Sequence, residues 1–224
     1  MSDSLFATID SGIYKLSDPY RQQLSKQMLE VLCTSSVAME RGNPEGLLGN
    51  FVSDVSLSEG NLEIASRFSI EQADFIILNN GGLRKPLPKG PIALGDIYEV
   101  MPFENQLVVL ECPARLVQQL ADFIASKGGT PVSGIRFQLD KKSGRATGIH
   151  INGSALDTTK TYRVMTADYL ANGGDQFDLF KEANKRTELG LKIRDALINY
   201  ARKAGNREEL LQPKLDGRIS YVVE

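Results

Sequence analysis

Three short loops carry side chains that could bind a ligand, and each loop borders an apolar segment. Their sequences are "NNGGLRKPL", "MPFENQL" and "TADYLANGGDQF". The side chains of interest are those of Asn79, Arg84, Phe103, Asn105, Tyr169 and Asp175. A plain turn needs a single residue with positive φ, whereas the first loop places two asparagines and two glycines in succession. We therefore predict that the loops form the walls of a site.

The combined residue types suit a nucleotide. Two aromatic rings can hold a nucleobase between them, and such stacking contributes about 1–3 kcal/mol per base. Asparagine amides donate to and accept from base edges, and Asp175 could accept hydrogen bonds from a ribose diol. The planar guanidinium of Arg84 suits a phosphate, while glycines let the backbone approach a ligand closely. The spacing matches neither the dinucleotide fingerprint G-x-G-x-x-G nor the phosphate loop G-x-x-x-x-G-K-[ST].

Each loop also has an explanation that needs no ligand. Paired glycines make turns, an aromatic ring can lie buried under a loop, and an aspartate can cap the turn that follows it. Taken one at a time, the loops favour this structural interpretation. Taken together, they form a matched set of base, ribose and phosphate contacts, and the residues alone leave both interpretations open.

A single histidine, His150, restricts the chemistry of the chain. A dinuclear metal hydrolase needs several imidazoles with carboxylates, and a Ser-His-Asp site needs one suitably placed imidazole. His150 lies in "TGIHING", an alternating stretch that runs into an Asn-Gly turn, and we expect it to end a strand. The sequence therefore predicts no catalytic and no metal-binding residue in this chain, and no cofactor of its own.

Composition and charge argue against further classes of function. The net charge of −2 and the pI near 5.6 predict no nucleic-acid partner. No apolar segment approaches the ~20 residues of a transmembrane helix, and "MSDSLFATIDSG" lacks the pattern of a signal peptide. Cys33 and Cys112 are predicted to be small apolar residues in a helix and a strand, with a disulfide between them left open.

Hydrophobic spacing predicts an α+β fold, with a mixed β-sheet packed against helices. Residues 1–16 are predicted as a lead-in, and residues 17–224 as a single domain. The predicted helices cover residues 20–33, which follow the start signal at 17–19, and then 43–57, 95–100, 113–127 and 187–205. The predicted strands cover residues 36–39, 73–79, 107–112, 132–140, 146–153, 160–167 and 217–223. The irregular alternation of helices and strands favours α+β over a doubly wound parallel sheet.

Three motifs, in order, resemble the C-terminal domain of the 5′-nucleotidase family. They are "LNNGGLRKPLPKGPIALGDIYEVMPFENQLVVLE", "VSGIRF" and "YRVMTADYLANGGDQF". The resemblance covers residues 45–180 and extends to the closing "LDGRISYVV". The family includes bacterial periplasmic UDP-sugar hydrolases and the animal ecto-5′-nucleotidase. The resemblance implies the fold of that domain and a nucleoside 5′-monophosphate or related nucleotide as ligand.

The resemblance also implies a role for individual residues. Asn79 and Arg84 fall on the asparagine and arginine that contact base and phosphate in the family. Phe103 matches a stacking ring and Asn105 a base contact, while Tyr169 stands where the family has a second stacking phenylalanine. Tyrosine keeps the π face and adds a hydroxyl.

Two further positions complete the implied contacts. Asp175 falls on the ribose-binding aspartate. Arg41 is the nearest candidate for a second phosphate-binding arginine, which in the family precedes an E-x-N-L-G-N helix start. Its spacing is off by one residue, and Leu47 replaces the usual asparagine.

In the family, catalysis belongs to an N-terminal metallophosphatase domain that holds two metal ions, and this chain shows none of its ligands. The first hypothesis is therefore a nucleotide-binding, substrate-specificity component that is inactive alone. It would need a separate metallophosphatase polypeptide with two divalent metal ions. The second is a non-enzymatic nucleotide- or nucleoside-binding module, and the third is that the loops only determine the fold. Family habit implies an extracytoplasmic location.

Overall fold

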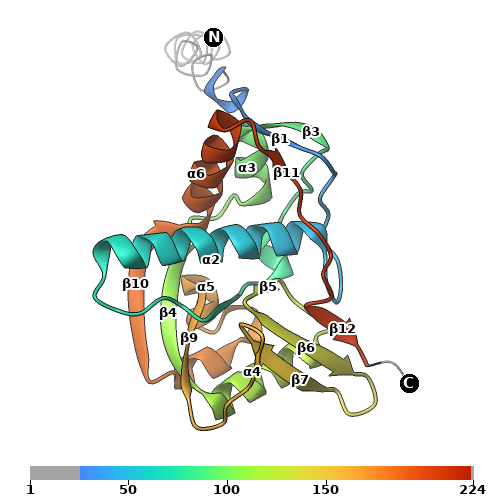
Figure 1. Ribbon diagram of the computed structural model, residues 1–224, viewed down its shortest axis with the longest axis vertical. Coiled ribbons are helices and arrows are strands. Elements are labelled where there is room, and N and C mark those ends of the chain that lie inside the picture. The colour runs from blue at the N-terminus through green and yellow to red at the C-terminus, as the bar shows by residue number, and fades with distance from the viewer. Residues whose placement is uncertain (1–25, 223–224) are drawn as a thin grey trace, which may run out of the picture.

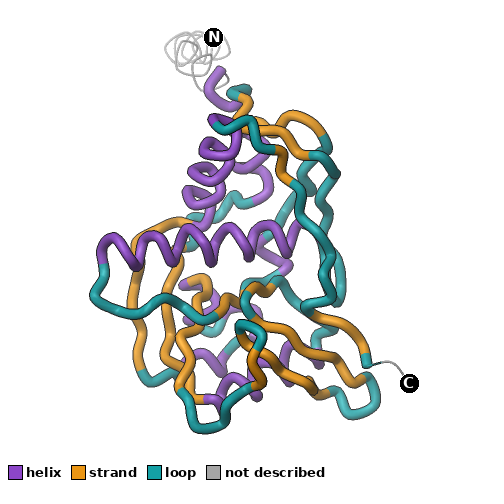
Figure 2. The backbone as a smooth tube through the Cα atoms, in the orientation of Figure 1, coloured by secondary structure: helices purple, strands orange, loops and turns teal. Residues whose placement is uncertain are grey.

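The computed structural model describes residues 26–222, which form three β-sheets and the helices around them (Figure 1). The predicted lead-in 1–16 and the helix start at 17–19 lie outside the described residues. The long helix α2 (Leu47–Arg67) crosses the middle of the molecule, between an upper and a lower group of strands. Figure 2 shows the same arrangement, with most of the strands in the lower group.

The five-stranded sheet lies below α2 and has the order β10-β4-β9-β2-β5. Its strands are β10 (Lys185–Lys192), β4 (Gln106–Pro113), β9 (Thr161–Ala167), β2 (Phe75–Ile77) and β5 (Val132–Ser133). β4 pairs antiparallel with both β9 and β10, whereas β2 pairs parallel with β9. Parallel and antiparallel pairs in one sheet, with helices packed around it, make the predicted α+β class correct.

Two smaller sheets flank the five-stranded sheet. The upper one has the order β11-β1-β3 and consists of β1 (Val31–Ser35), β3 (Gly90–Ala93) and β11 (Leu210–Leu211). The other has the order β12-β6-β7-β8 and consists of β6 (Ile135–Asp140), β7 (Arg145–Ile151), β8 (Ser154–Ala155) and β12 (Ile219–Tyr221). The last strand, β12, pairs parallel with β6 and so ties the C-terminal segment to the lower half of the molecule.

The remaining helices pack by their apolar stripes. They are α3 (Leu94–Val100), α4 (Ala114–Ser126), α5 (Asp168–Ala171) and α6 (Ile193–Asn206). In α4 the buried side chains recur three and four residues apart, as at Val117, Leu120 and Ile124. The helix ends before Gly128 and Gly129, whose φ angles of 79° and 111° favour glycine. The helix predicted from Pro113 is therefore confirmed.

Two predicted helices extend into strands, the first at its end and the last at its beginning. Val31–Ser35 is the strand β1, because it pairs with β3 and β11, so Cys33 lies in a strand. The predicted strand at 36–39 contributes only the isolated pairing of Met39 with Leu87. The final helix begins at Ile193 rather than at residue 187, because Lys185–Lys192 pairs with β4. In both cases the spacing of apolar residues fits a helix, but the segment forms a strand because it pairs with a strand that is distant in the sequence.

The two cysteines are free and buried, Cys33 in β1 and Cys112 in β4. Burial disfavours the thiolate, and it raises the pKa of Cys33 to about 11 and that of Cys112 to about 12. They serve as small apolar side chains of the core.

Candidate functional site

Sheet topology brings the three sequence-selected loops to one edge of the five-stranded sheet. β2 and β9 are parallel neighbours, so the segments that follow them leave at the same edge. β4 runs antiparallel to β9, so the segment that precedes β4 lies at that edge too. The first loop follows β2, the second precedes β4, and the third follows β9. Residues from widely separated parts of the chain therefore meet here.

The loops enclose a hollow of about 300 Å³, which we call the loop hollow. This volume is at the lower end of the range for small-molecule sites. The hollow is lined by Asn79, Gly81, Gly82, Arg84, Phe103, Asn105, Tyr169 and Asp175. Six of the seven sequence-selected residues thus share one cavity. Arg41 is exposed and is not among the lining residues.

The two aromatic rings of the loop hollow are open to solvent. Phe103 is 43% exposed and Tyr169 is 45% exposed. The Tyr169 ring lies directly over Gly174, where an added Cβ would be 2.5 Å from ring carbons. Glycine at this position therefore lets the ring approach the backbone. The sequence placed Gly174 only in a turn, and this close approach was missed.

Asp175 joins the first loop to the third. Its Oδ2 accepts a hydrogen bond from Asn79 Nδ2 at 2.5 Å, and its Oδ1 accepts one from the Tyr169 hydroxyl at 3.0 Å. Gly81 lies under this contact, because an added Cβ would be 3.1 Å from Asp175 Oδ2. Two neutral donors therefore fix the carboxylate of Asp175, Asn79 from the first loop and Tyr169 from the third.

The guanidinium of Arg84 has no ion-pair partner among residues 26–222. Its backbone N–H donates to Val100 O at 2.8 Å, which fixes the main chain. Its guanidinium makes only a long contact of 3.5 Å to Gly81 O. Among residues 26–222, no carboxylate lies within ion-pair distance of Arg84. An exposed guanidinium at a cavity wall is available to an external anion.

The loop that carries Phe103 and Asn105 is clamped by the start of α6. Ile193 N–H donates to Asn105 O at 3.0 Å, and Arg194 donates to Pro102 O at 3.2 Å. These bonds leave the Phe103 side chain free while they fix the backbone on either side of it.

Glu104, at the tip of the same loop, receives two cations. Lys192 donates to its Oε2 at 2.5 Å and Arg194 to its Oε1 at 2.6 Å. Hydrogen bonds from Lys192 and then Arg194 lower the pKa of Glu104. Arg194 is only 6% exposed and also lies 4.4 Å from the Tyr98 ring centre. No local sequence signal marks these residues, since their partners lie about ninety positions away.

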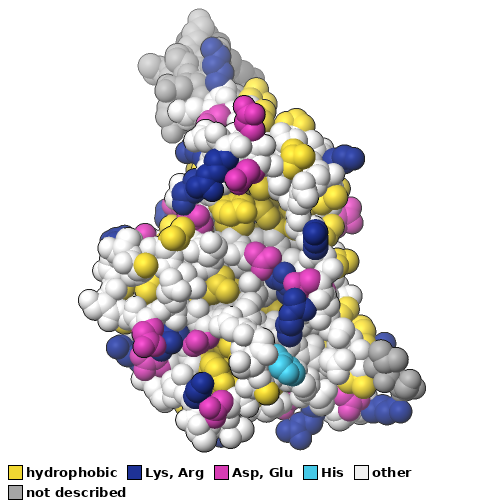
Figure 3. Space-filling model, viewed as in Figure 1, with side chains coloured by type: hydrophobic (Ala, Val, Ile, Leu, Met, Phe, Trp, Pro, Cys, Tyr) yellow, Lys and Arg dark blue, Asp and Glu magenta, His cyan; other side chains and the backbone are white. Residues whose placement is uncertain are grey.

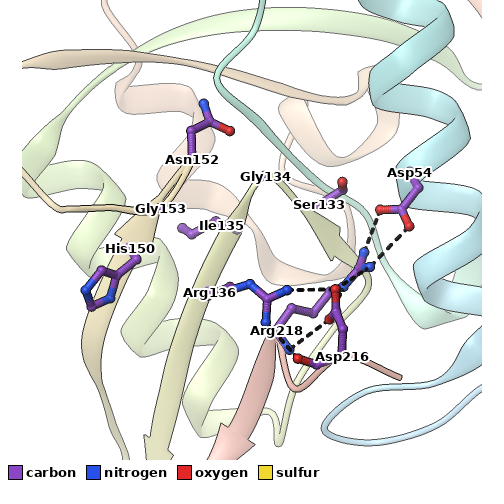
Figure 4. A pocket seen from close by; sticks show the side chains of 10 residues that line it. All are labelled: Asp54, Ser133, Gly134, Ile135, Arg136, His150, Asn152, Gly153, Asp216 and Arg218. Carbon is purple, nitrogen blue, oxygen red and sulfur yellow. Dashed lines mark hydrogen bonds and ion pairs between the residues drawn. The ribbon is translucent and has the colours of Figure 1, made fainter. Parts of the chain in front are cut away.

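A second hollow, of about 260 Å³, lies between α2, β6, β7 and the start of β12 (Figure 4). We call it the ion-pair hollow, because its charged side chains bind each other. Arg218 donates to both oxygens of Asp54, to both oxygens of Asp216 and to Val132 O. All five of its N–H groups are thereby used.

Asp216 in turn accepts a bond from Arg136 at 2.8 Å. Burial alone would raise the pKa of Asp216, but hydrogen bonds and charge from Arg218 outweigh it and lower the pKa. Figure 3 shows this face, where acidic and basic side chains gather near the single histidine. The positive and negative side chains bind each other, and Arg218 thereby attaches the start of β12 to α2.

His150 lies in β7, opposite Arg136, at the rim of the ion-pair hollow. Its Nδ1 is 2.8 Å from Gly148 O, and no interaction in Figure 4 reaches its ring. Within residues 26–222, no three histidine, cysteine or acidic side chains gather as they would around a metal ion. The nearby carboxylates of Asp54 and Asp216 are already bound by Arg218. These residues therefore do not fit the dimetal centre of a metallophosphatase.

The comparisons with known proteins agree on one family. The sequence profile of the 5′-nucleotidase C-terminal domain matches residues 29–182. The chain belongs to the 5′-nucleotidase C-terminal domain family. It is 34% identical over 189 residues to the trifunctional nucleotide phosphoesterase protein YfkN of Bacillus subtilis, covering 78% of this chain and 12% of that one. It is 27% identical to protein UshA of Yersinia enterocolitica, covering 95% of this chain and 38% of that one.

Solved structures show the same fold. The 5′-nucleotidase precursor of Thermus thermophilus matches with a TM-score of 0.77 and 28% identity, over 92% of this chain and 42% of that one. The NAD nucleotidase of Haemophilus influenzae matches with a TM-score of 0.71 at 17% identity, over 96% of this chain and 42% of that one. The chain therefore spans less than half the length of these family members. No helix within residues 26–222 is long and apolar enough to cross a membrane.

Proposed function

We propose that this chain binds a nucleotide in the loop hollow and serves as the substrate-specificity component of a 5′-nucleotidase-type phosphohydrolase. One observation carries the proposal. The guanidinium of Arg84, which has no ion-pair partner among residues 26–222, lines the same cavity as two exposed aromatic rings, Phe103 and Tyr169. A cation and stacking surfaces in one cavity match the anionic and aromatic parts of a nucleotide.

Each lining residue has a part in this proposal. The base stacks between Phe103 and Tyr169, and the amides of Asn79 and Asn105 bind its edge. Asp175 accepts hydrogen bonds from the ribose diol, for which its fixed carboxylate is suited. Arg84 binds the phosphate. Because the loop backbones are already held by Val100 and by the start of α6, little conformational entropy is lost on binding.

Arg41 has a weaker place in the proposal. It is kept as a candidate phosphate contact because the resemblance assigns it one. Its absence from the lining of the loop hollow means that it would reach the phosphate only from outside the cavity.

Hydrolysis requires a further component in this proposal. The family resemblance assigns catalysis to a metallophosphatase domain with two divalent metal ions, and the described residues do not fit such a centre. We propose that a separate metallophosphatase polypeptide supplies it, while this chain positions the nucleotide for the reaction. An extracytoplasmic location belongs to the same proposal, because it follows from the family.

The test is a titration of the whole chain with AMP and with adenosine, followed by NMR. Saturable shifts of the Phe103 and Tyr169 ring resonances are expected with both ligands. Arg84→Ala should weaken AMP binding by about tenfold or more, since a charge-assisted hydrogen bond contributes about 1.5–3 kcal/mol. Adenosine, which lacks the phosphate, should bind the variant as it binds the natural chain.

The control variant is Arg115→Ala, which removes another exposed guanidinium, on α4. It should leave both affinities unchanged. Equal losses for AMP and adenosine in Arg84→Ala would contradict the phosphate role. Absence of ring shifts with either ligand would leave only a structural role for the loops. Hydrolysis of AMP by the purified chain without a partner would contradict the division of labour.

A further inference from the structure

A third hollow, of about 350 Å³, lies against the loop hollow. Asn79, Gly81 and Asp175 line both cavities, so these residues form a shared wall. The far side of the third hollow is lined by Asn43, Asn80, Lys127, Gln176 and Phe177, among others. The two cavities therefore lie next to each other, with the Asp175 side chain on the lining of both.

The shared wall depends on a strained backbone. Asp175 and Gln176 have φ angles of 51° and 68°, so two consecutive residues other than glycine are in the left-handed region. Such a conformation is costly for each residue and persists where the surrounding structure imposes it. Here it places Asp175 on both hollows and Gln176 on the third hollow only. The strained backbone therefore places two polar side chains on the lining of the third hollow.

Lys127 gives the third hollow a cation. Its Nζ donates to Gln176 Oε1 at 2.7 Å and lies 5.3 Å from the centre of the Phe123 ring. Within residues 26–222, Lys127 has no carboxylate at ion-pair distance. An ammonium has three donors, so the bond to Gln176 leaves it able to bind an anion as well.

Amide groups provide further polar contacts in the third hollow. Asn80 Nδ2 donates to Asn43 Oδ1 at 2.9 Å, and each of these amides has other donor or acceptor positions. A lysine that follows a helix can also serve the helix dipole alone. Lys127 follows α4, but its ammonium donates a hydrogen bond to the Gln176 side chain. An interaction with the helix dipole does not require this bond.

We propose that the third hollow binds a phosphoryl group carried on the ribose of the nucleotide that occupies the loop hollow. The proposal rests on the proposed function, in which Asp175 binds the ribose diol. A phosphoryl group on the 3′ oxygen removes the proton of that hydroxyl, so Asp175 keeps only the hydrogen bond from the 2′ hydroxyl. The phosphoryl group then lies at the shared wall, where Lys127 can neutralise part of its charge. Asp175 repels a phosphate, but both of its oxygens already accept hydrogen bonds, from Asn79 and from Tyr169. The phosphoryl group is either a terminal 3′-phosphate or the link to a second nucleotide.

Calorimetric titration of the whole chain with three ligands tests the proposal. The ligands are AMP, adenosine 3′,5′-bisphosphate and the 5′-phosphorylated dinucleotide of adenosine. The bisphosphate should bind about three- to tenfold more tightly than AMP, as expected for one charged contact at a partly exposed site. Lys127→Gln should abolish this difference. Lys160→Gln, which changes an exposed lysine in the turn before β9, should preserve it.

The dinucleotide distinguishes the two sources of the phosphoryl group. Binding tighter than that of the bisphosphate, with the same dependence on Lys127, identifies a linked nucleotide. Weaker binding identifies a terminal phosphate. If AMP binds but the bisphosphate binds no tighter, or if its advantage survives in Lys127→Gln, the proposal is wrong and the proposed function stands. If none of the ligands binds, both fail.

Discussion

The loop hollow and the ion-pair hollow contain the same kinds of charged residue in opposite situations. In the ion-pair hollow, Arg218 is 8% exposed and gives every N–H to an acceptor of the protein. In the loop hollow, Arg84 is exposed, and within residues 26–222 its guanidinium has only the long contact to Gly81 O. The carboxylates differ in the same way: Asp216 binds two arginines, whereas the partners of Asp175 in the described part of the chain are neutral donors.

The comparison shows that residue type does not separate a structural cluster from a binding site. A buried charge that is fully paired stabilises one arrangement of the chain, and its removal leaves partners uncompensated. An exposed charge with no protein partner contributes little to stability and keeps its interactions for a ligand. Substitutions in the ion-pair hollow should therefore lower the free energy of unfolding. Substitutions in the loop hollow should instead lower the affinity for a ligand.

The largest effect is expected for Arg218→Ala. Loss of this side chain leaves Asp54 and Val132 O without the guanidinium that binds them, and it leaves Asp216 with Arg136 as its remaining cation. It also removes the link between β12 and α2. The free energy of unfolding should fall by about 2–3 kcal/mol, because the buried Val132 O loses its donor while the Asp54 and Asp216 side chains are 47% and 35% exposed and can be hydrated. Urea denaturation followed by circular dichroism measures the change. Arg84→Ala is the matched control and should change stability by less than about 0.5 kcal/mol. Similar losses in the two variants would contradict the comparison.

A smaller effect, in affinity rather than stability, is expected for Phe103→Ala. Removal of one stacking face should weaken AMP binding by about 1–3 kcal/mol. Unfolding should be nearly unchanged, because the ring is 43% exposed while its loop is held by Ile193 and Arg194. Calorimetric titration measures the affinity. Tyr221→Ala, which removes an exposed ring from β12, is the control and should not affect the affinity for AMP. A loss of stability with no loss of affinity would make Phe103 a fold determinant.

The smallest effect is expected in acid, and it should come from Asp216. The pKa of Asp216 is lower in the folded chain than the ordinary value near 3.9, so its stabilising contribution is present above that value. The contribution is lost as pH falls through the lowered pKa of the folded state. Asp216→Asn should be less stable than the natural chain by under about 1 kcal/mol at pH 6. The difference should shrink toward zero as the pH falls through the lowered pKa of Asp216, in urea melts at each pH. A constant difference would exclude titration of Asp216 as its cause.

The sequence allowed the site residues to be chosen, but it did not show how they meet. Clusters of asparagine, glycine and single aromatic residues after apolar runs are local signals, so the loops could be found. Their shared edge depends on β9 pairing with both β2 and β4, which joins segments far apart in the chain. The clamp on the Phe103 loop was missed for the same reason. Arg194 looks like an ordinary residue at a helix start, and only the fold places it against Pro102 and Glu104.

The errors in secondary structure have a common cause. Val31–Ser35 and Lys185–Lys192 each adjoin a true helix and have apolar residues that continue its spacing. Both are strands because a neighbouring strand offers backbone hydrogen bonds, and local propensity does not encode that neighbour. At Gly190 the φ angle of 69° also interrupts any helix. The helix predicted at 113–127 matches α4, whose apolar stripe is continuous. The helix predicted at 43–57 is α2, but α2 begins at Leu47 and continues to Arg67, where the buried residues include Glu59 and Gly60 and the apolar spacing no longer marks it.

The contact between Gly174 and Tyr169 restricts how this protein can change over time. Gly174 does not use a left-handed backbone, so alanine is permitted there by conformation and is opposed only by the ring above it. A larger residue at position 174 requires that the ring at position 169 move or become smaller. We expect the two positions to vary together among descendants of this chain. A redesign of the cavity for a different ligand would have to treat them as one unit.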